Sequence, residues 1–176
     1  MVPSFQDWHR RKLTPWRHMS AAPALRIETE AGAITLRLRT DAAPETCKYI
    51  LQCVGSGLYN GRSFYRSDFV IQFGLHGSSV ENPHGDLSVN ETHAHVKLSN
   101  RRGTCSVAHW DVPDCGNTEC FINLGDNAHL DEAYGGYCVF AEVAMDDAVS
   151  FATVDKIAAM VKSGQNTRID RIVQAD

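Results

Sequence analysis

The chain of 176 residues has no apolar run that approaches the roughly 20 residues a membrane-spanning helix needs. It also lacks a strong excess of one charge: with a net charge of -4, neither nucleic acid nor a membrane surface is expected as a partner. This length suits one sizeable core rather than two domains. We therefore expect a soluble, monomeric protein with one main domain.

The six cysteines contain no CxxC pair, and no signal-peptide core precedes them. Disulfide frameworks are typical of short secreted domains. We therefore expect reduced thiols in an intracellular compartment, with the cytoplasm favoured and the mitochondrion left open. Cys115, in the loop-like "PDCGNT", is expected to be the most exposed.

The eight histidines also lack the spacing of metal ligands. No HxxxH and no Cys/His pair lies on one element, and the "HAH" of His93 to His95 falls in a loop. The sequence predicts neither a metal site nor a cofactor.

Residues 1–23 differ from the rest of the chain. They are basic, hold one acid, Asp7, and show no strand or helix period. We expect an N-terminal extension, slightly favoured as a plain segment over a mitochondrial targeting peptide, followed by a domain over residues 24–176. Trp8 and Trp16 suggest that part of the extension packs onto this domain.

Alternating apolar residues predict eight short strands. Two surround a turn at residues 30–32, two form a hairpin over 63–74, and four lie within 104–110, 119–125, 137–143 and 167–176. Helices are predicted from Pro44 to Gly55 or Gly57, and over 147–161 with a buried stripe that includes Val149. The irregular stretch after residue 74 is long enough to be functional or disordered. The pattern favours a mainly β fold: a closed or nearly closed β-barrel with two capping helices.

One residue contradicts the apolar character of the 63–74 hairpin, "SFYRSDFVIQFG". Arg66 is a permanent cation among phenylalanines, and burying it unpaired would be costly. Two interpretations stay open on the residues alone. Arg66 is either a structural arginine paired with Asp68 or Glu119, or a donor in a functional site.

Several motifs agree with one known family. "YNGRSFYR", "FVIQFG", "RGTCSVAH", "CFINLGDNAHLD" and "GGYCVFAEV" resemble the cyclophilins, which are prolyl isomerases, and are most similar to the bacterial-type branch. The resemblance runs from about Leu25 to the C-terminus. It implies an eight-stranded antiparallel closed barrel capped by two helices, and peptidyl-prolyl isomerase activity that assists folding. It also implies proline-containing peptides and unfolded proteins as partners, and no cofactor.

The resemblance also implies a site. Arg66 matches the arginine that points at the substrate proline, Gln72 the glutamine that braces it, and Phe69 a wall of the proline pocket; these are the catalytic positions. The other pocket residues would be Val70, Phe121, Leu130 and Tyr137, and the edge that pairs with the substrate backbone would be Ala108 and His109. Glu119 and His129 complete the substrate-binding set.

Four departures qualify this assignment. Only Ser67 and Asp68 separate Arg66 from Phe69, two residues fewer than in the family pattern. Glu119 replaces a glutamine, His129 a tryptophan and Tyr137 a histidine. We expect Glu119 to compete with substrate for the donors of Arg66, and His129 to make cyclosporin binding weak. A catalytically weak proline-binding scaffold within a larger assembly remains the alternative function.

Overall fold

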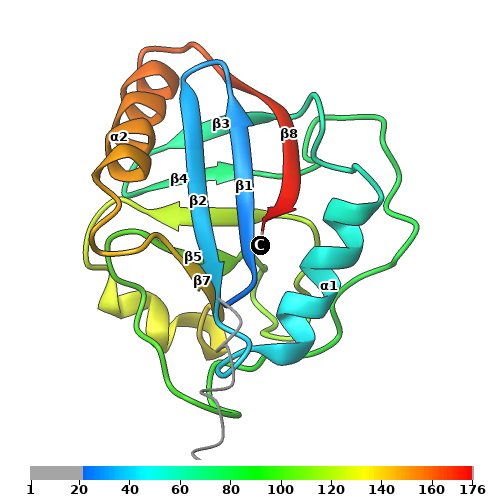
Figure 1. Cartoon of the computed structure of the whole chain (residues 1–176). Helices are drawn as coiled ribbons and strands as arrows, with labels where there is room; N and C mark the ends of the chain where they lie inside the picture. Colours follow the sequence, from blue (N-terminus) through cyan, green and yellow to red (C-terminus); the bar gives the residue numbers. More distant parts are fainter. Residues whose placement is uncertain (1–21, 176) are drawn as a thin grey trace, which may run out of the picture.

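The computed structural model describes residues 22–175, which form a closed barrel of eight strands with two helices (Figure 1). The strands are β1 (Ala24–Thr29), β2 (Gly32–Leu38), β3 (Ser63–Ser67), β4 (Val70–Phe73), β5 (Thr104–Val107), β6 (Cys120–Asn123), β7 (Val139–Glu142) and β8 (Thr167–Ala175). The predicted extension lies outside the described residues, apart from its last two positions.

The strands close in the order β1-β2-β7-β5-β6-β4-β3-β8. Every neighbouring pair is antiparallel, including β1 with β8. Figure 1 shows β1 and β2 crossing in front of β3 and β4 at a steep angle. The predicted fold class is confirmed.

Two α-helices lie on opposite sides of the barrel: α1 (Pro44–Gly55) and α2 (Ala148–Lys162). Pro44 begins α1, and the buried Glu91 carboxylate accepts the backbone N–H groups of Glu45 and Thr46 at 3.2 and 2.8 Å. These bonds satisfy two of the donors that a helix start leaves unpaired. Two short 3₁₀ helices, η2 (Ala128–Asp131) and η3 (Ala133–Gly135), precede β7.

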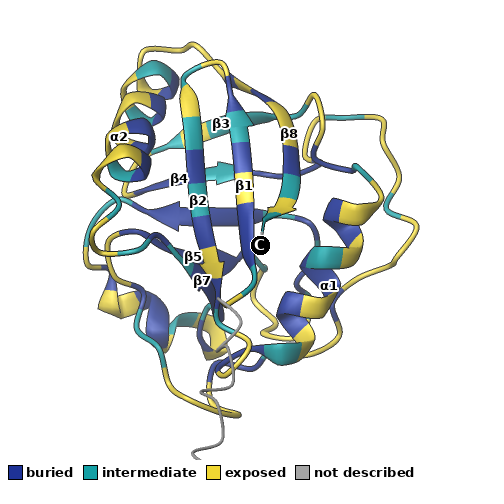
Figure 2. Ribbon diagram, in the orientation of Figure 1, coloured by how far each residue is buried: buried dark blue, intermediate teal, exposed yellow. Residues whose placement is uncertain are grey.

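The predicted stripe of α2 is wrong at one residue. Val149 is 73% exposed, whereas Ser150, Thr153, Val154, Ile157 and Val161 form the buried face. Val149 is one position, about 100°, away from Ser150 around the helix, so it lies outside that face. Figure 2 shows the resulting division of each helix into a buried and an exposed side.

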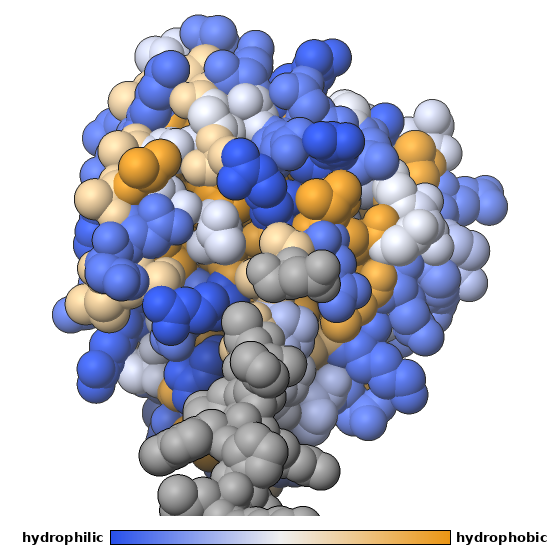
Figure 3. All heavy atoms as spheres, in the orientation of Figure 1, coloured by the Kyte–Doolittle hydropathy of each residue, from blue (hydrophilic) through white to orange (hydrophobic). Residues whose placement is uncertain are grey.

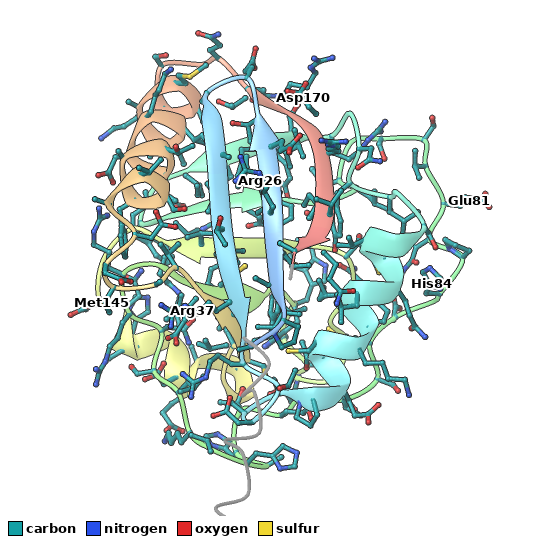
Figure 4. The ribbon with its side chains drawn as sticks, in the orientation of Figure 1. Arg26, Arg37, Glu81, His84, Met145 and Asp170 are labelled. Carbon is teal, nitrogen blue, oxygen red and sulfur yellow. The ribbon has the colours of Figure 1, made fainter. Side chains whose placement is uncertain are left out.

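The core follows the alternation of the strands. Ile27 and Leu36 point into the barrel and are fully buried, while Arg26 and Arg37 project from the outside of β1 and β2 (Figure 4). Figure 3 shows that this outer face is largely hydrophilic, with separate apolar side chains. Within residues 22–175, none of the helices has the length and apolar character needed to cross a membrane.

The long stretch after residue 74 follows an irregular path that side-chain and backbone bonds hold to the domain. The Tyr49 hydroxyl donates to the Gly85 carbonyl at 2.8 Å, and Leu87 makes a β-bridge with Gly116. These contacts hold the stretch in place beside the site described next.

Candidate active site

A row of side chains crosses the outer face of the barrel. Arg66 pairs with Gln72 between β3 and β4, and Gln72 pairs with Phe121 between β4 and β6. Directly opposed residues in antiparallel strands share a face. The register therefore places a cation, an amide and an aromatic ring side by side.

The same alternation builds an apolar cluster outside the barrel. In β6, Cys120 and Ile122 belong to the barrel core, whereas Phe121 joins a second cluster. This outer apolar cluster consists of Val70, Phe121 and Leu130, with Ala108 and Tyr137 packed against it. The rings of Phe121 and Tyr137 meet edge to face at 5.7 Å. Burial raises the pKa of the Tyr137 phenol.

The outer apolar cluster forms one part of a groove of about 600 Å³. Arg66, Gln72, Phe69 and Glu119 also line it. Residues outside the strands and helices also line it: Val80, Asn82, Asp86, Trp110 and Cys115. The groove therefore combines the apolar side chains of the outer apolar cluster with charged and polar ones.

A bulge in β3 decides which side chains face this groove. The pairing of β3 with β4 shifts register between Phe64 and Arg66, which leaves Tyr65 as the extra residue. A bulge locally breaks the alternation of side chains. Tyr65 and Arg66 accordingly both line the groove, while Phe64 is buried in the barrel core.

Arg66 is not a buried cation, contrary to the apolar look of its hairpin. Its side chain is 44% exposed and that of Asp68 is 43% exposed. Nε donates to Asp68 Oδ2 at 2.9 Å, Nη2 lies 2.7 Å from the same oxygen, and Nη1 donates to Gln72 Oε1 at 2.9 Å. The guanidinium is thus held on two sides at the border of the outer apolar cluster.

The expected contact between Glu119 and Arg66 is wrong. The Glu119 carboxylate instead accepts the Tyr65 hydroxyl and, at 2.8 Å, the backbone N–H of His76. Burial, followed by the bond to Glu119, raises the pKa of Tyr65. Asp68 is the carboxylate that pairs with Arg66.

Phe69 and His129 lie at the edge of the site. Phe69 is 42% exposed because it occupies the short turn between β3 and β4 rather than a strand position. Its ring centroid is 5.5 Å from Arg66 Cζ and 5.5 Å from the His129 ring. His129 contacts Phe69 but does not line the groove, so only an indirect contact with a ligand is expected.

Ala108 and His109 follow β5 along the groove. The N–H of Ala108 donates to the Glu119 carbonyl at 2.8 Å. The His109 ring stacks on Tyr137 at 4.3 Å, and its Nε2 lies 2.9 Å from the Gly136 carbonyl. The side chain of His109 therefore supports a pocket wall, while its main chain lies just beyond the end of β5.

Sequence reasoning missed Tyr65, His76 and Trp110 as groove residues. Trp110 is 82% exposed; the sequence predicted it at the end of a strand within 104–110, whereas β5 ends at Val107. Tyr65 gave no signal, because simple alternation places it on the opposite face from Arg66. Residues 22–175 bring together no group of three or more His, Cys, Asp or Glu side chains suited to a metal ion.

The chain is thus a closed eight-stranded barrel that holds an arginine, through Asp68 and Gln72, beside an apolar cluster on its outer face. The family model of the cyclophilin type peptidyl-prolyl cis-trans isomerase/CLD matches residues 24–176. The chain belongs to this family of isomerases, and the predicted family and enzyme class are confirmed.

Two bacterial relatives agree with that membership. Peptidyl-prolyl cis-trans isomerase A of Dickeya dadantii is 36% identical over 121 residues, 66% of this chain and 63% of that protein. Peptidyl-prolyl cis-trans isomerase B of Escherichia coli is 32% identical over 156 residues, 82% of this chain and 91% of that protein. The chain thus spans less than two thirds of the Dickeya protein and most of the Escherichia protein.

A solved structure agrees as well. The cyclophilin type peptidyl-prolyl cis-trans isomerase of Cryptosporidium parvum, crystallised in the presence of the dipeptide Ala-Pro, aligns with a TM-score of 0.72 and 25% identity. The alignment covers 87% of this chain and 99% of that chain.

Proposed function

We propose that the groove binds an X–Pro segment and that Arg66 accelerates its cis–trans rotation. The outer apolar cluster receives the proline ring, and the strand edge at His109 receives the backbone of the peptide. The Ala-Pro dipeptide present with the Cryptosporidium relative supports a ligand of this kind.

The guanidinium beside the outer apolar cluster carries this proposal. Rotation about an X–Pro bond is slow because amide resonance is lost, with an activation energy of about 20 kcal/mol. In the twisted transition state the prolyl nitrogen gains a lone pair that can accept a hydrogen bond. Asp68 and Gln72 engage two sides of Arg66, and N–H groups on Nη1 and Nη2 remain for that nitrogen. Such a bond favours the transition state over the planar ground state.

Substituting Arg66 tests this role. Arg66→Ala should lower kcat/KM at least about tenfold, or roughly 1.4 kcal/mol of transition-state stabilisation. The measurement is a protease-coupled assay on an Ala-Pro-Phe peptide. A wild type indistinguishable from buffer would instead support the weak proline-binding scaffold.

Cyclosporin binding is proposed to be weak. His129 offers less area than tryptophan and lies against Phe69 rather than in the groove. His129→Trp should tighten binding by about 1–2 kcal/mol, through aromatic burial and an indole hydrogen bond. Calorimetry that finds tight wild-type binding, unchanged by the substitution, would refute this.

We further propose that the protein acts as a monomer on proline-containing peptides and unfolded proteins, without nucleic-acid or membrane partners. Its balanced charge supports this. Sedimentation equilibrium tests the oligomeric state, and a dimer at micromolar concentration would contradict the proposal.

A further inference from the structure

A directed chain of hydrogen bonds runs from Glu119 to the guanidinium of Arg66. The Tyr65 hydroxyl donates to Glu119 Oε2. Gln72 Nε2 donates to the Tyr65 oxygen at 2.8 Å, and Arg66 Nη1 donates to Gln72 Oε1 at 2.9 Å. We call these four side chains the relay.

The carboxylate sets the direction of the relay. An ionised carboxylate only accepts hydrogen bonds, and Glu119 faces two donors, the Tyr65 hydroxyl and the His76 N–H. Burial and the bond to Glu119 raise the pKa of Tyr65, so the phenol keeps its proton. That proton points to Glu119, and the phenol oxygen therefore accepts the amide NH₂ of Gln72. The amide must then turn its carbonyl oxygen toward Arg66.

The local backbone accommodates the Glu119 carboxylate. A side chain at Gly74 would collide with it, so the glycine provides the space. The β3 bulge brings Tyr65 to the same groove as Arg66. Two features of the main chain thus place the two ends of the relay within reach of each other.

We propose that Glu119 is a positioning residue for Arg66, acting through Tyr65 and the amide orientation of Gln72. This inference rests on the proposed function of Arg66. Glu119 does not compete with the substrate for the arginine; it secures the acceptor that holds Nη1 in place.

Glu119→Gln is the sharpest substitution, because it keeps the size of the side chain. An amide offers one acceptor oxygen and one donor NH₂, so NH₂ must face either Tyr65 or the His76 N–H. If the NH₂ of the new amide faces Tyr65, the Tyr65 hydroxyl turns and donates to the carbonyl oxygen of Gln72. The NH₂ of Gln72 then points toward Arg66, which is also a donor. In either arrangement two donors oppose each other. We expect kcat to fall about fivefold, the effect of roughly one net hydrogen bond, with KM little changed.

The test compares kcat and KM of the wild type, Glu119→Gln, Tyr65→Phe and the double variant in the assay used for Arg66→Ala. Each single substitution should lower kcat, and the double variant should be no slower than Tyr65→Phe, because the relay is already cut. Unchanged kcat in Glu119→Gln, or losses that simply add, would overturn the proposal. Thermal unfolding shows whether each variant is folded.

Two further variants separate positioning from a general effect of charge. Glu81 projects from a loop at the edge of the molecule (Figure 4) and does not line the groove, so Glu81→Gln should retain full activity. Glu119→Gln combined with Gln72→Glu moves the carboxylate from position 119 to position 72, beside Arg66. The Tyr65 hydroxyl can then donate to one oxygen of this carboxylate, and Arg66 to the other. This pair should regain most of the lost kcat. Failure to regain it would contradict the directional argument.

Failure of the relay and failure of the proposed function give different results. If Arg66→Ala retains wild-type activity, the role of Arg66 is wrong. If Arg66→Ala is slow while Glu119→Gln is as fast as the wild type, only the relay is wrong.

Discussion

Asp68 holds Arg66 and closes the turn that follows it. Its Oδ2 accepts Arg66 Nε, while its Oδ1 accepts the backbone N–H of Val70 at 3.1 Å. The short turn between β3 and β4 therefore supplies its own brace for the arginine. A guanidinium fixed before the substrate arrives needs less reorganisation in the transition state.

Asp68→Asn should lower kcat/KM about three- to tenfold by loosening that brace. The amide still accepts the Val70 N–H, so the free energy of unfolding should change by less than about 1 kcal/mol, as for an exposed ion pair. Steady-state kinetics and urea unfolding measure the two quantities. An increase in kcat/KM would show instead that the carboxylate weakens the arginine as a donor.

At the scale of the elements, the sequence predicted the strands and helices well because their signals are local. Pro44 indicated the start of α1, and alternation indicated each strand. The β3 bulge could not be predicted, because it depends on how β3 pairs with β4. The assignment of Val149 failed for a related reason: several apolar residues in α2 allow more than one stripe, and packing against the barrel selects among them.

The start of α2 allows a prediction of its own. Asp147 caps the helix: it accepts the N–H of Ser150 at 2.9 Å and its hydroxyl at 2.6 Å. The Ser150 hydroxyl, together with its N–H, lowers the pKa of Asp147. Asp147→Ala should cost about 1 kcal/mol of unfolding free energy at neutral pH.

The unfolding free energy lost in Asp147→Ala should depend on pH and should become smaller as the pH falls. Because the pKa is lower in the folded state, the stabilisation is complete above the unfolded value of about 3.9 and is lost as pH falls through the folded value. Wild type and variant should therefore converge in urea unfolding at low pH. Asp146→Ala, at a side chain that is 90% exposed, is the control and should change little. An equal loss at pH 7 and pH 3 would show that the charge is irrelevant.

For the whole molecule, the number of strands was predictable but their order was not. Closure of β1 with β8, and of β4 with β6, joins segments far apart in the chain. The site was predictable as a set of residues only through family resemblance. The hydrogen bond between Glu119 and Tyr65 could not be predicted, because it depends on the β4–β6 register and on the bulge at Tyr65.

The reactivity of the cysteine thiols provides a test of how the whole barrel is packed. All six are free; five are buried and Cys115 is half-buried. Burial raises the pKa of Cys47 to about 12 and those of Cys53 and Cys138 to about 11. A thiol reagent at pH 8 should therefore modify one cysteine rapidly and the others only on unfolding. Cys115→Ser should abolish the fast reaction, and several fast thiols would contradict this packing.

The N-terminal extension, expected as a plain segment with a mitochondrial targeting peptide as the alternative, consists of residues that the structure does not describe, apart from Ala22 and Pro23. Fusing residues 1–23 to a fluorescent protein tests it, and import into mitochondria would favour the targeting alternative.

The groove is proposed to bind an X–Pro peptide, and Arg66 to accelerate its rotation. Exchange spectroscopy by NMR on an Ala-Pro peptide at equilibrium measures binding and interconversion together. The wild type should give cis–trans exchange cross-peaks, and Arg66→Ala should lose most of the exchange rate while shifting the peptide resonances to a similar extent. Equal exchange rates for the two proteins, or no exchange with either, would contradict this role of Arg66.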